Sequence, residues 1–211
     1  MRDLKSMREE YMRGKLNKSS VEKDPVLQFK KWMDESIEAA ILHPTAMNLS
    51  TVGRDMQPSS RIVLLKEFDE KGFIFYTNYN SRKARELSEN PRASLLFFWN
   101  ELEREVRIEG LVEKVSGKEG DDYFSSRPRN SQISASISEQ SRTVPHRKFL
   151  EEAFNQFAEE NPGSIKRPDF WGGYRLLPHY FEFWQGREDR LHDRLAYTLR
   201  SHSWKIRRLC P

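Results

Sequence analysis

The feature that most limits the fold is a succession of short β-branched and aromatic segments separated by turn residues. These segments have the length and composition of strands, and they follow one another without a helix between each pair. The chain has no G-x-G-x-x-G motif and no P-loop, which disfavours a βαβ dinucleotide fold. The pattern predicts a mainly β protein with helices (α+β), built as an antiparallel β-barrel with flanking helices. The expected strands are 45–52, 61–66, 73–77, 93–99, 104–115, 171–177, 180–185, 195–200 and 204–209.

Four helices are expected from local start and stop signals. Asp24-Pro25 opens a helix that reaches His43-Pro44, and Ser81 caps a helix over 82–88. Ser116 and Glu119 form a capping box, which predicts a helix to about Ser125. Pro145 opens a fourth helix, with an apolar face, that ends at Asn161-Pro162-Gly163. The polar segment 127–142 is expected to be an ordered loop or a strained helix.

Composition limits the class of protein and its partners. The 211 residues fit one domain, 25–211, preceded by an N-terminal segment or lid, 1–24. No apolar run is long enough to span a membrane, no signal-peptide core begins the chain, and the single cysteine offers no disulfide, so we expect a cytoplasmic protein. The net charge of +4 favours an anionic partner. Because the arginines are spread among apolar segments, separate phosphate pockets fit better than a nucleic-acid surface.

Two basic segments are candidate anion sites. In Arg61-Ile62-Val63-Leu64-Leu65-Lys66, strand alternation places the two cations on opposite faces, so each would serve a different anion. A half-buried strand with solvated ends explains the same pattern. Arg82 and Lys83 begin a helix, where backbone N–H groups already favour an anion, although taken by itself this segment fits a solvated surface turn better.

Two further clusters carry possible chemistry. Tyr123 and Arg127 are one helical turn apart, with Ser131 and Gln132 close behind, so they could converge on one ligand. If 190–194 is extended, Arg190, His192 and Arg194 share one face and would meet an anion or an electron-rich ring. The spacing of the five histidines offers no metal triad, so we expect no metal and no metallohydrolase.

Taken together, these phrases resemble the pyridoxine (pyridoxamine) 5′-phosphate oxidase family along almost the whole chain. Several phrases in the right order are more specific than any single motif. They run from Arg8-Glu9-Glu10-Tyr11 to Arg208-Leu209-Cys210-Pro211 and include 61–66, 75–78, 81–83, 126–129, 170–173, 182–186 and 190–194.

The resemblance implies a split β-barrel homodimer with FMN bound across the subunit interface. Arg190 and His192 would be catalytic and lie over the pyridine ring, and Arg8 and Tyr11 would form part of a lid. The substrate phosphate would be held by Lys66, Tyr123, Arg127 and Ser131. The implied FMN residues are Arg61, Ile62, Val63, Leu64, Leu65, Lys66, Tyr76, Thr77, Arg82, Lys83, Glu105, Gln140, Ser141, Trp184 and Arg194.

The implied reaction oxidises pyridoxine or pyridoxamine 5′-phosphate to pyridoxal 5′-phosphate, with O2 as acceptor, H2O2 as product and ammonia released from the amine. Three positions depart from the family pattern: Glu105 replaces Gln, Ser134 replaces Gly and Ser125 replaces His. Since a carboxylate accepts hydrogen bonds where an amide can donate, Glu105 predicts weaker FMN binding or an altered redox potential.

Three other functions remain open at this point. A flavin reductase of the same barrel type would share the FMN residues but would not need the four phosphate-holding residues together. A non-catalytic carrier of FMN or pyridoxal phosphate would not need Arg190 and His192. A basic nucleic-acid-binding module is disfavoured by the scattered arginines.

Overall fold

The computed structural model describes residue 11 and residues 13–211. In this part of the chain, nine strands form one antiparallel sheet in the order β2-β1-β5-β6-β7-β4-β3, with β8 beside β7 and β9 beside β8. The strands are β1 (Ala46–Val52), β2 (Pro58–Leu64), β3 (Glu67–Asp69), β4 (Gly72–Asn78), β5 (Arg92–Trp99), β6 (Arg104–Lys114), β7 (Trp171–Gln185), β8 (Asp193–Arg200) and β9 (Ser203–Leu209).

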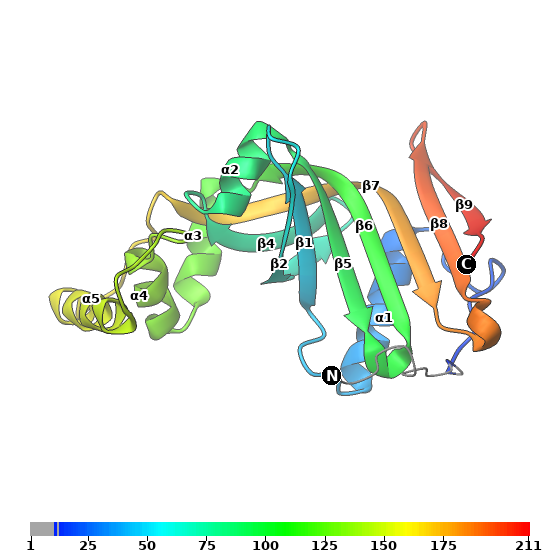
Figure 1. Ribbon diagram of the computed structural model, residues 1–211, viewed down its shortest axis with the longest axis horizontal. Helices are drawn as coiled ribbons and strands as arrows, with labels where there is room; N and C mark the ends of the chain where they lie inside the picture. Colours follow the sequence, from blue (N-terminus) through cyan, green and yellow to red (C-terminus); the bar gives the residue numbers. More distant parts are fainter. Residues whose placement is uncertain (1–10, 12) are drawn as a thin grey trace, which may run out of the picture.

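The sheet curls so strongly that β2, at one end of the strand order, comes back against β4, as the ribbon in Figure 1 shows. After β2 the chain crosses to the opposite end of the strand order, where the Lys66 N–H donates to the Ile74 carbonyl of β4 at 2.9 Å. The Leu65 N–H donates to Thr45 at 2.9 Å, so the crossing segment is held on both sides. This curled antiparallel sheet with flanking helices confirms the predicted fold class.

The core fills the inside of the curl. Helix α1 (Pro25–Glu38) contributes Phe29, whose fully buried ring lies 5.0 Å from the rings of Phe68, Phe73 and Phe97. These contacts are edge-on, the geometry that aromatic rings prefer in cores. Burying these large rings therefore fixes α1 against the sheet.

Strand β7 corrects the prediction of two separate strands, 171–177 and 180–185. It is one strand of 15 residues, and its register against β6 shifts between Glu109 and Gly110. Its first half pairs with β4 and its second half with β8. A β-bulge bends a strand without ending it, which lets one strand serve both neighbours.

The helix starts at Asp24, Ser81 and Ser116 are confirmed. Each side chain accepts a hydrogen bond from the first turn of its helix, and the Ser116–Glu119 capping box is complete. The corresponding helices are α1, α2 (Arg82–Glu89) and α3 (Gly117–Ser126). The predicted end of α1 at His43-Pro44 is wrong, because the chain turns at Ala39 and Ala40 adopts a positive φ of 52°.

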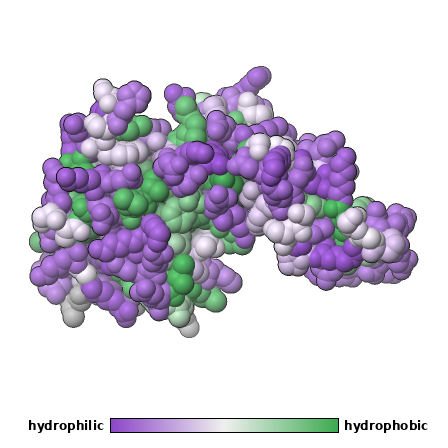
Figure 2. Space-filling model, turned by 180° about the vertical axis from the view of Figure 1, so that it is seen from behind, coloured by the Kyte–Doolittle hydropathy of each residue, from purple (hydrophilic) through white to green (hydrophobic). Residues whose placement is uncertain are grey.

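Two helices project from one end of the molecule, at the left of Figure 1. The segment expected to be a loop or a strained helix forms α4 (Arg129–Ile137), and α5 (Arg147–Glu160) begins after His146 rather than at Pro145. The apolar face of α5 is not buried: Phe149 and Leu150 are 48% and 41% exposed. Seen from behind in Figure 2, this projection is mainly hydrophilic with a few apolar side chains.

No helix within the described residues is long and apolar enough to cross a membrane. The strand predicted over 61–66 is displaced, since β2 begins at Pro58 and ends at Leu64. Lys66 therefore lies outside the strand, and the alternation argument that placed it opposite Arg61 is wrong.

Candidate active site

The N-terminus of α2 brings together five of the predicted FMN residues, Thr77, Arg82, Lys83, Gln140 and Ser141. The Lys83 Nζ donates to Gln140 Oε1 at 2.8 Å and to Thr77 Oγ1 at 3.1 Å, and the Arg82 N–H donates to Ser141 Oγ at 3.1 Å. Ser141 has a positive φ of 75°, in the turn that follows α4. The segment after α4 thus reaches back to the start of α2, so residues 57 to 63 positions apart in the sequence form one polar cluster.

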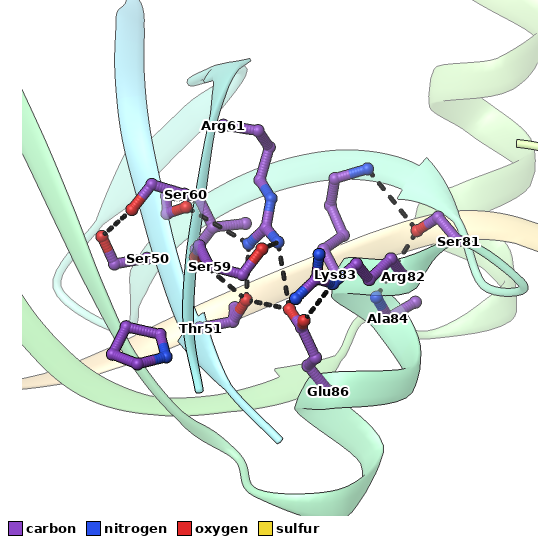
Figure 3. Close-up of polar contacts among 12 residues, drawn as sticks. Ser50, Thr51, Ser59, Ser60, Arg61, Ser81, Arg82, Lys83, Ala84 and Glu86 are labelled. Carbon is purple, nitrogen blue, oxygen red and sulfur yellow. Dashed lines mark hydrogen bonds and ion pairs between the residues drawn. The ribbon is translucent and has the colours of Figure 1, made fainter. Parts of the chain in front are cut away.

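Glu86 lies under this cluster and was missed by the sequence analysis. In Figure 3 its carboxylate points between the guanidinium groups of Arg61 and Arg82, to which it is paired at 3.0 and 2.7 Å. Thr51 Oγ1 donates to the same carboxylate at 2.5 Å. The spacing of Arg82 and Glu86, four residues apart on one helix, was the available signal. We call Arg61, Arg82, Lys83, Glu86, Gln140 and Ser141 the α2 cluster.

Burial and charge adjust the ionisation of this cluster. Burial, reinforced by neighbouring Arg61, lowers the pKa of the Lys83 ammonium to about 8. Hydrogen bonds from Thr51, Arg82 and Arg61 outweigh burial and lower the pKa of the Glu86 carboxyl. The cluster therefore holds three cations against one buried carboxylate at neutral pH, an excess of positive charge suited to an anion.

A second group surrounds three stacked rings, Tyr76, Tyr123 and Trp171, which we call the aromatic stack. The Tyr76 ring lies 3.9 Å from that of Tyr123 and 5.4 Å from that of Trp171, nearly parallel to both. The Arg127 guanidinium lies 4.7 Å from the centre of the Trp171 ring. The structure thus brings together Tyr123 and Arg127, as predicted, although Arg127 follows α3 as its C-cap instead of lying on it. Trp171 had no predicted role.

Arg127 is the residue of this group with unmet hydrogen-bonding capacity. Its Nη1 is buried and has no hydrogen-bond partner among the described residues. Burial also lowers the pKa of its guanidinium. A buried N–H group without a partner is costly, so an anionic ligand would relieve this cost.

The other two predicted phosphate residues lie in the same region but make fewer contacts. Ser131 lies in the first turn of α4, and its N–H donates to the Pro128 carbonyl at 2.8 Å. Lys66 is exposed, and its backbone is joined to Ile74, two residues before Tyr76 on β4. Among the described residues, neither side chain forms a hydrogen bond with Arg127.

A third group crosses the outer face of the sheet. Glu105 of β6 pairs in register with Trp184 of β7, which pairs with Arg194 of β8. We call these three residues the β6–β8 row. Arg194 Nε donates to the buried carboxylate of Glu182 at 2.6 Å. Burial raises the pKa of the Glu105 carboxyl, against the lowering effect of nearby Arg107.

The prediction that Arg190, His192 and Arg194 share one extended face is wrong. Asp189 and Arg190 adopt positive φ angles of 54° and 59° in a short 3-10 turn, η3 (Glu188–Arg190), so strand alternation does not apply before β8. Arg190 is exposed. His192 instead turns toward Trp184, with ring centres 4.8 Å apart.

Tyr11 joins this end of the row. Its ring lies 5.6 Å from that of Trp184 and 5.7 Å from that of His192, edge-on to both. Arg8, the other predicted lid residue, lies outside the described residues. The chain therefore presents two separated sets of predicted ligands: the α2 cluster with the aromatic stack, and the β6–β8 row with Tyr11 and His192.

Comparison with known proteins decides the family. The model of the pyridoxamine 5′-phosphate oxidase family matches residues 33–160, and that of the pyridoxine 5′-phosphate oxidase C-terminal dimerisation region matches residues 171–211. A pyridoxine/pyridoxamine 5′-phosphate oxidase of Cupriavidus pinatubonensis is 53% identical over 100% of both chains. This chain belongs to the pyridoxamine 5′-phosphate oxidase family.

Other relatives agree with this membership. The protein of the same name from Nostoc sp. is 50% identical over 100% of this chain and 99% of its own length. Among solved structures, PhzG from Burkholderia lata, in complex with tetrahydrophenazine-1-carboxylic acid, has a TM-score of 0.88 and 32% identity, covering 92% of this chain and 95% of its own. An FMN-binding protein from Nostoc punctiforme, at 14% identity and a TM-score of 0.72, shares the fold.

The family explains the exposed apolar surface of the sheet. Ile62 and Leu64 of β2 and Phe98 of β5 are 66%, 43% and 52% exposed. Phe98 pairs in register with Glu105, so it extends the β6–β8 row. In a family with a dimerisation region, an apolar surface beside polar ligand residues fits contact with a second copy.

Proposed function

We propose that this chain is an FMN-dependent oxidase that converts pyridoxine 5′-phosphate or pyridoxamine 5′-phosphate to pyridoxal 5′-phosphate. Full-length relatives of that name support the reaction. O2 is proposed as the electron acceptor, with H2O2 as product and ammonia released from the amine substrate. Among the three alternatives, the nucleic-acid-binding module is set aside by the family. The reductase and the carrier are distinguished by the assay below.

The donor set of the α2 cluster fits the phosphate of FMN. Arg82 and Lys83 begin α2, and Arg61 lies on neighbouring β2, paired with Glu86. A phosphate there meets three side-chain cations and the positive end of the helix dipole. We propose that Arg61, Arg82, Lys83, Gln140 and Ser141 bind the FMN of one site, with Thr77 holding Lys83 in place. Residues Ile62 to Lys66 and Tyr76 would complete this side of the pocket.

The observation that carries the substrate proposal is the buried, unpartnered Nη1 of Arg127 beside the aromatic stack. A phosphate fits the guanidinium, and neighbouring phenol and hydroxyl groups supply neutral donors. We propose that Arg127, Tyr123, Ser131 and Lys66 hold the substrate phosphate. Lys66 would have to turn toward Arg127 when the substrate binds.

His192 is suited to donate a hydrogen bond. Its Nδ1 accepts from the Arg187 N–H at 3.1 Å, so the neutral ring carries its proton on Nε2. Burial and the nearby Arg190 lower the pKa of His192, which favours this neutral form. We propose that His192 orients the substrate through Nε2–H and that Arg190 approaches the ring only after η3 rearranges. Bound FMN supplies the acceptor for the two electrons removed at C4′.

The two separated ligand sets support a shared site. We propose that the α2 cluster of one protomer and the β6–β8 row of the other bind one FMN in a homodimer. Glu105, Trp184 and Arg194 would complete the flavin pocket, and Tyr11, with Arg8, would close it as part of a lid formed by residues 1–24 over the domain 25–211. We also propose that the enzyme works in the cytoplasm.

An oxygen-consumption assay tests the function. Protein loaded with FMN should form pyridoxal 5′-phosphate from the pyridoxine and pyridoxamine phosphates with matching loss of O2. It should act far more weakly on pyridoxine without phosphate. Binding of FMN without product would favour a carrier, and flavin reduction only by a nicotinamide would favour a reductase.

A variant pair tests the phosphate site. Arg127→Ala should raise KM for pyridoxine 5′-phosphate by at least about tenfold, the effect of losing one charge-assisted hydrogen bond. Arg147→Ala removes the same charge from exposed α5, where Arg147 pairs with Glu151, and should leave KM unchanged. Equal KM values for the two variants would contradict the assigned role of Arg127.

A further inference from the structure

Glu86 is the buried charge of the α2 cluster for which the proposed reaction has no use. It lies on α2, its side chain is 10% exposed, and it faces Arg61 and Arg82. A carboxylate beside a phosphate site repels the phosphate, so its position there requires another benefit.

The hydrogen bonds of Glu86 define its relation to each arginine. Oε1 accepts from Arg82 Nε at 2.7 Å, and Oε2 accepts from Arg61 Nη2 at 3.0 Å. The carboxylate therefore binds Arg82 through Nε. Among the described residues, the two terminal nitrogens of Arg82 have no hydrogen-bond partner and are available to a ligand. The Arg82 side chain as a whole is 55% exposed.

Arg61 is held more completely. Its Nη1 donates to Thr51 Oγ1 at 2.5 Å and to the Leu49 carbonyl at 3.3 Å, and its Nη2 also donates to Ser59 Oγ at 2.8 Å. Thr51 in turn donates to Glu86, which closes a ring of hydrogen bonds visible in Figure 3. This ring holds the Arg61 guanidinium before any ligand arrives, and the Arg82 guanidinium is tied to the same carboxylate through its Nε.

We propose that Glu86 is a positioning residue that pre-organises Arg61 and Arg82 for the phosphate of the flavin. The inference rests on the proposed FMN site. Without the carboxylate, Arg61, Arg82 and Lys83 would repel one another and lose their fixed geometry. The benefit of held arginines then exceeds the repulsion that one carboxylate exerts on the phosphate.

The replacement Glu86→Gln distinguishes two roles for this carboxylate, because each role predicts an opposite change in FMN affinity. The isosteric amide must turn its NH2 toward one of the donors it faces, which breaks that hydrogen bond. If charge alone mattered, losing a carboxylate would tighten FMN binding. If Glu86 positions the arginines, FMN binding weakens by about tenfold, the equivalent of one charge-assisted hydrogen bond.

The test titrates apo-protein with FMN and with riboflavin, which lacks the phosphate, and follows flavin fluorescence. Glu86→Gln should weaken FMN while changing riboflavin affinity by less than about twofold, since the phosphate alone contacts the two arginines. Glu89→Gln is the matched control. It removes the same charge from the same helix, where Glu89 accepts only from the Arg54 N–H among the described contacts, and should leave FMN affinity unchanged.

Thr51→Val provides a second variant if Glu86→Gln unfolds, because it removes the hydroxyl that joins Arg61 to Glu86. It should weaken FMN in the same direction. Unchanged or tighter FMN binding by folded Glu86→Gln, or an equal loss of riboflavin affinity, would overturn the positioning role. Failure of the wild-type protein to bind FMN would instead overturn the proposed function itself.

Discussion

Lys83 is the cation of the α2 cluster whose charge changes near neutral pH. Its pKa of about 8 means that the empty site loses one positive charge as pH rises through this value. A bound phosphate stabilises the ammonium, so FMN binding takes up a proton there. FMN affinity should change little between about pH 6.5 and 7, where the FMN phosphate is mainly dianionic and Lys83 is charged, and should fall by up to about tenfold per pH unit well above the Lys83 pKa.

Titration of apo-protein with FMN across this pH range measures the effect. Lys83→Arg keeps its charge and should flatten the profile. A wild-type affinity that does not change between neutral pH and about pH 9.5 would exclude Lys83 as a titrating phosphate ligand.

Glu105 gives a second pH dependence, this time in the stability of the fold. Burial raises the pKa of its carboxyl in the folded chain, so the folded protein holds this proton more tightly than the unfolded chain does. Ionising Glu105 therefore costs stability as pH rises above the ordinary glutamate pKa. Glu105→Gln should be more stable than wild type at pH 7, and the difference should vanish in acid.

Urea unfolding of both proteins at several pH values, at equal protomer concentration, measures that difference. The same substitution should tighten FMN, because an amide can donate to a flavin carbonyl and an ionised carboxylate cannot. A stability difference independent of pH, together with unchanged FMN affinity, would refute both expectations.

Single residues show where sequence reasoning about the site stops. Arg82, Lys83, Gln140 and Ser141 were assigned through the resemblance, and the structure brings them together. Glu86 and Trp171 were missed, because a glutamate on a polar helix face and a tryptophan at a strand start have common structural explanations. Only their contacts with arginines distinguish them.

Among the secondary-structure elements, the bend in β7 allows a specific prediction about stability. Gly110 of β6 lies at the register shift, where an added Cβ would be 2.2 Å from the Leu177 carbonyl oxygen. Since this neighbour is backbone, Gly110→Ala should destabilise the protein by about 1–3 kcal/mol. The substitution should also disturb the bend that lets β7 pair with both β4 and β8.

The matched control is Gly163→Ala, where no heavy atom lies within 4 Å of the added Cβ. Its free energy of unfolding should stay within about 0.5 kcal/mol of wild type. Equal stability of the two alanine variants would show that the bulge tolerates a side chain and has no strict need for glycine.

Helices and strands were predictable from the sequence where the residues that determine them are adjacent in the chain. The caps of α1, α2 and α3 rest on side chains adjacent to the helix, so the sequence indicates them directly. The joined strand β7 and the turn at Asp189 and Arg190 depend on pairing with distant strands. Periodicity carries no signal for either, which is why both were predicted wrongly.

If the proposed FMN site is shared between protomers, the protein must bind FMN as a dimer. Arg61 and Arg194 belong to the two separated ligand sets, so Arg61→Ala and Arg194→Ala should each reduce FMN binding. When the two variants are co-expressed, half of the dimers are mixed, and each mixed dimer has one intact site. About a quarter of wild-type FMN binding should therefore return.

As a control, each variant is purified separately, and the two are then mixed under conditions that exchange subunits. Recovery should require the exchange. No recovery in verified mixed dimers would mean that each FMN site is formed within one chain.

The central claim is that the bound flavin receives electrons directly from the phosphorylated vitamin. Its most direct measurement mixes FMN-loaded protein with pyridoxamine 5′-phosphate in the absence of oxygen. We predict that the visible absorbance of the flavin disappears as about one pyridoxal 5′-phosphate forms per FMN, and that air restores the colour. A flavin that stays oxidised while the substrate is bound, with no pyridoxal 5′-phosphate formed, would contradict the proposed function.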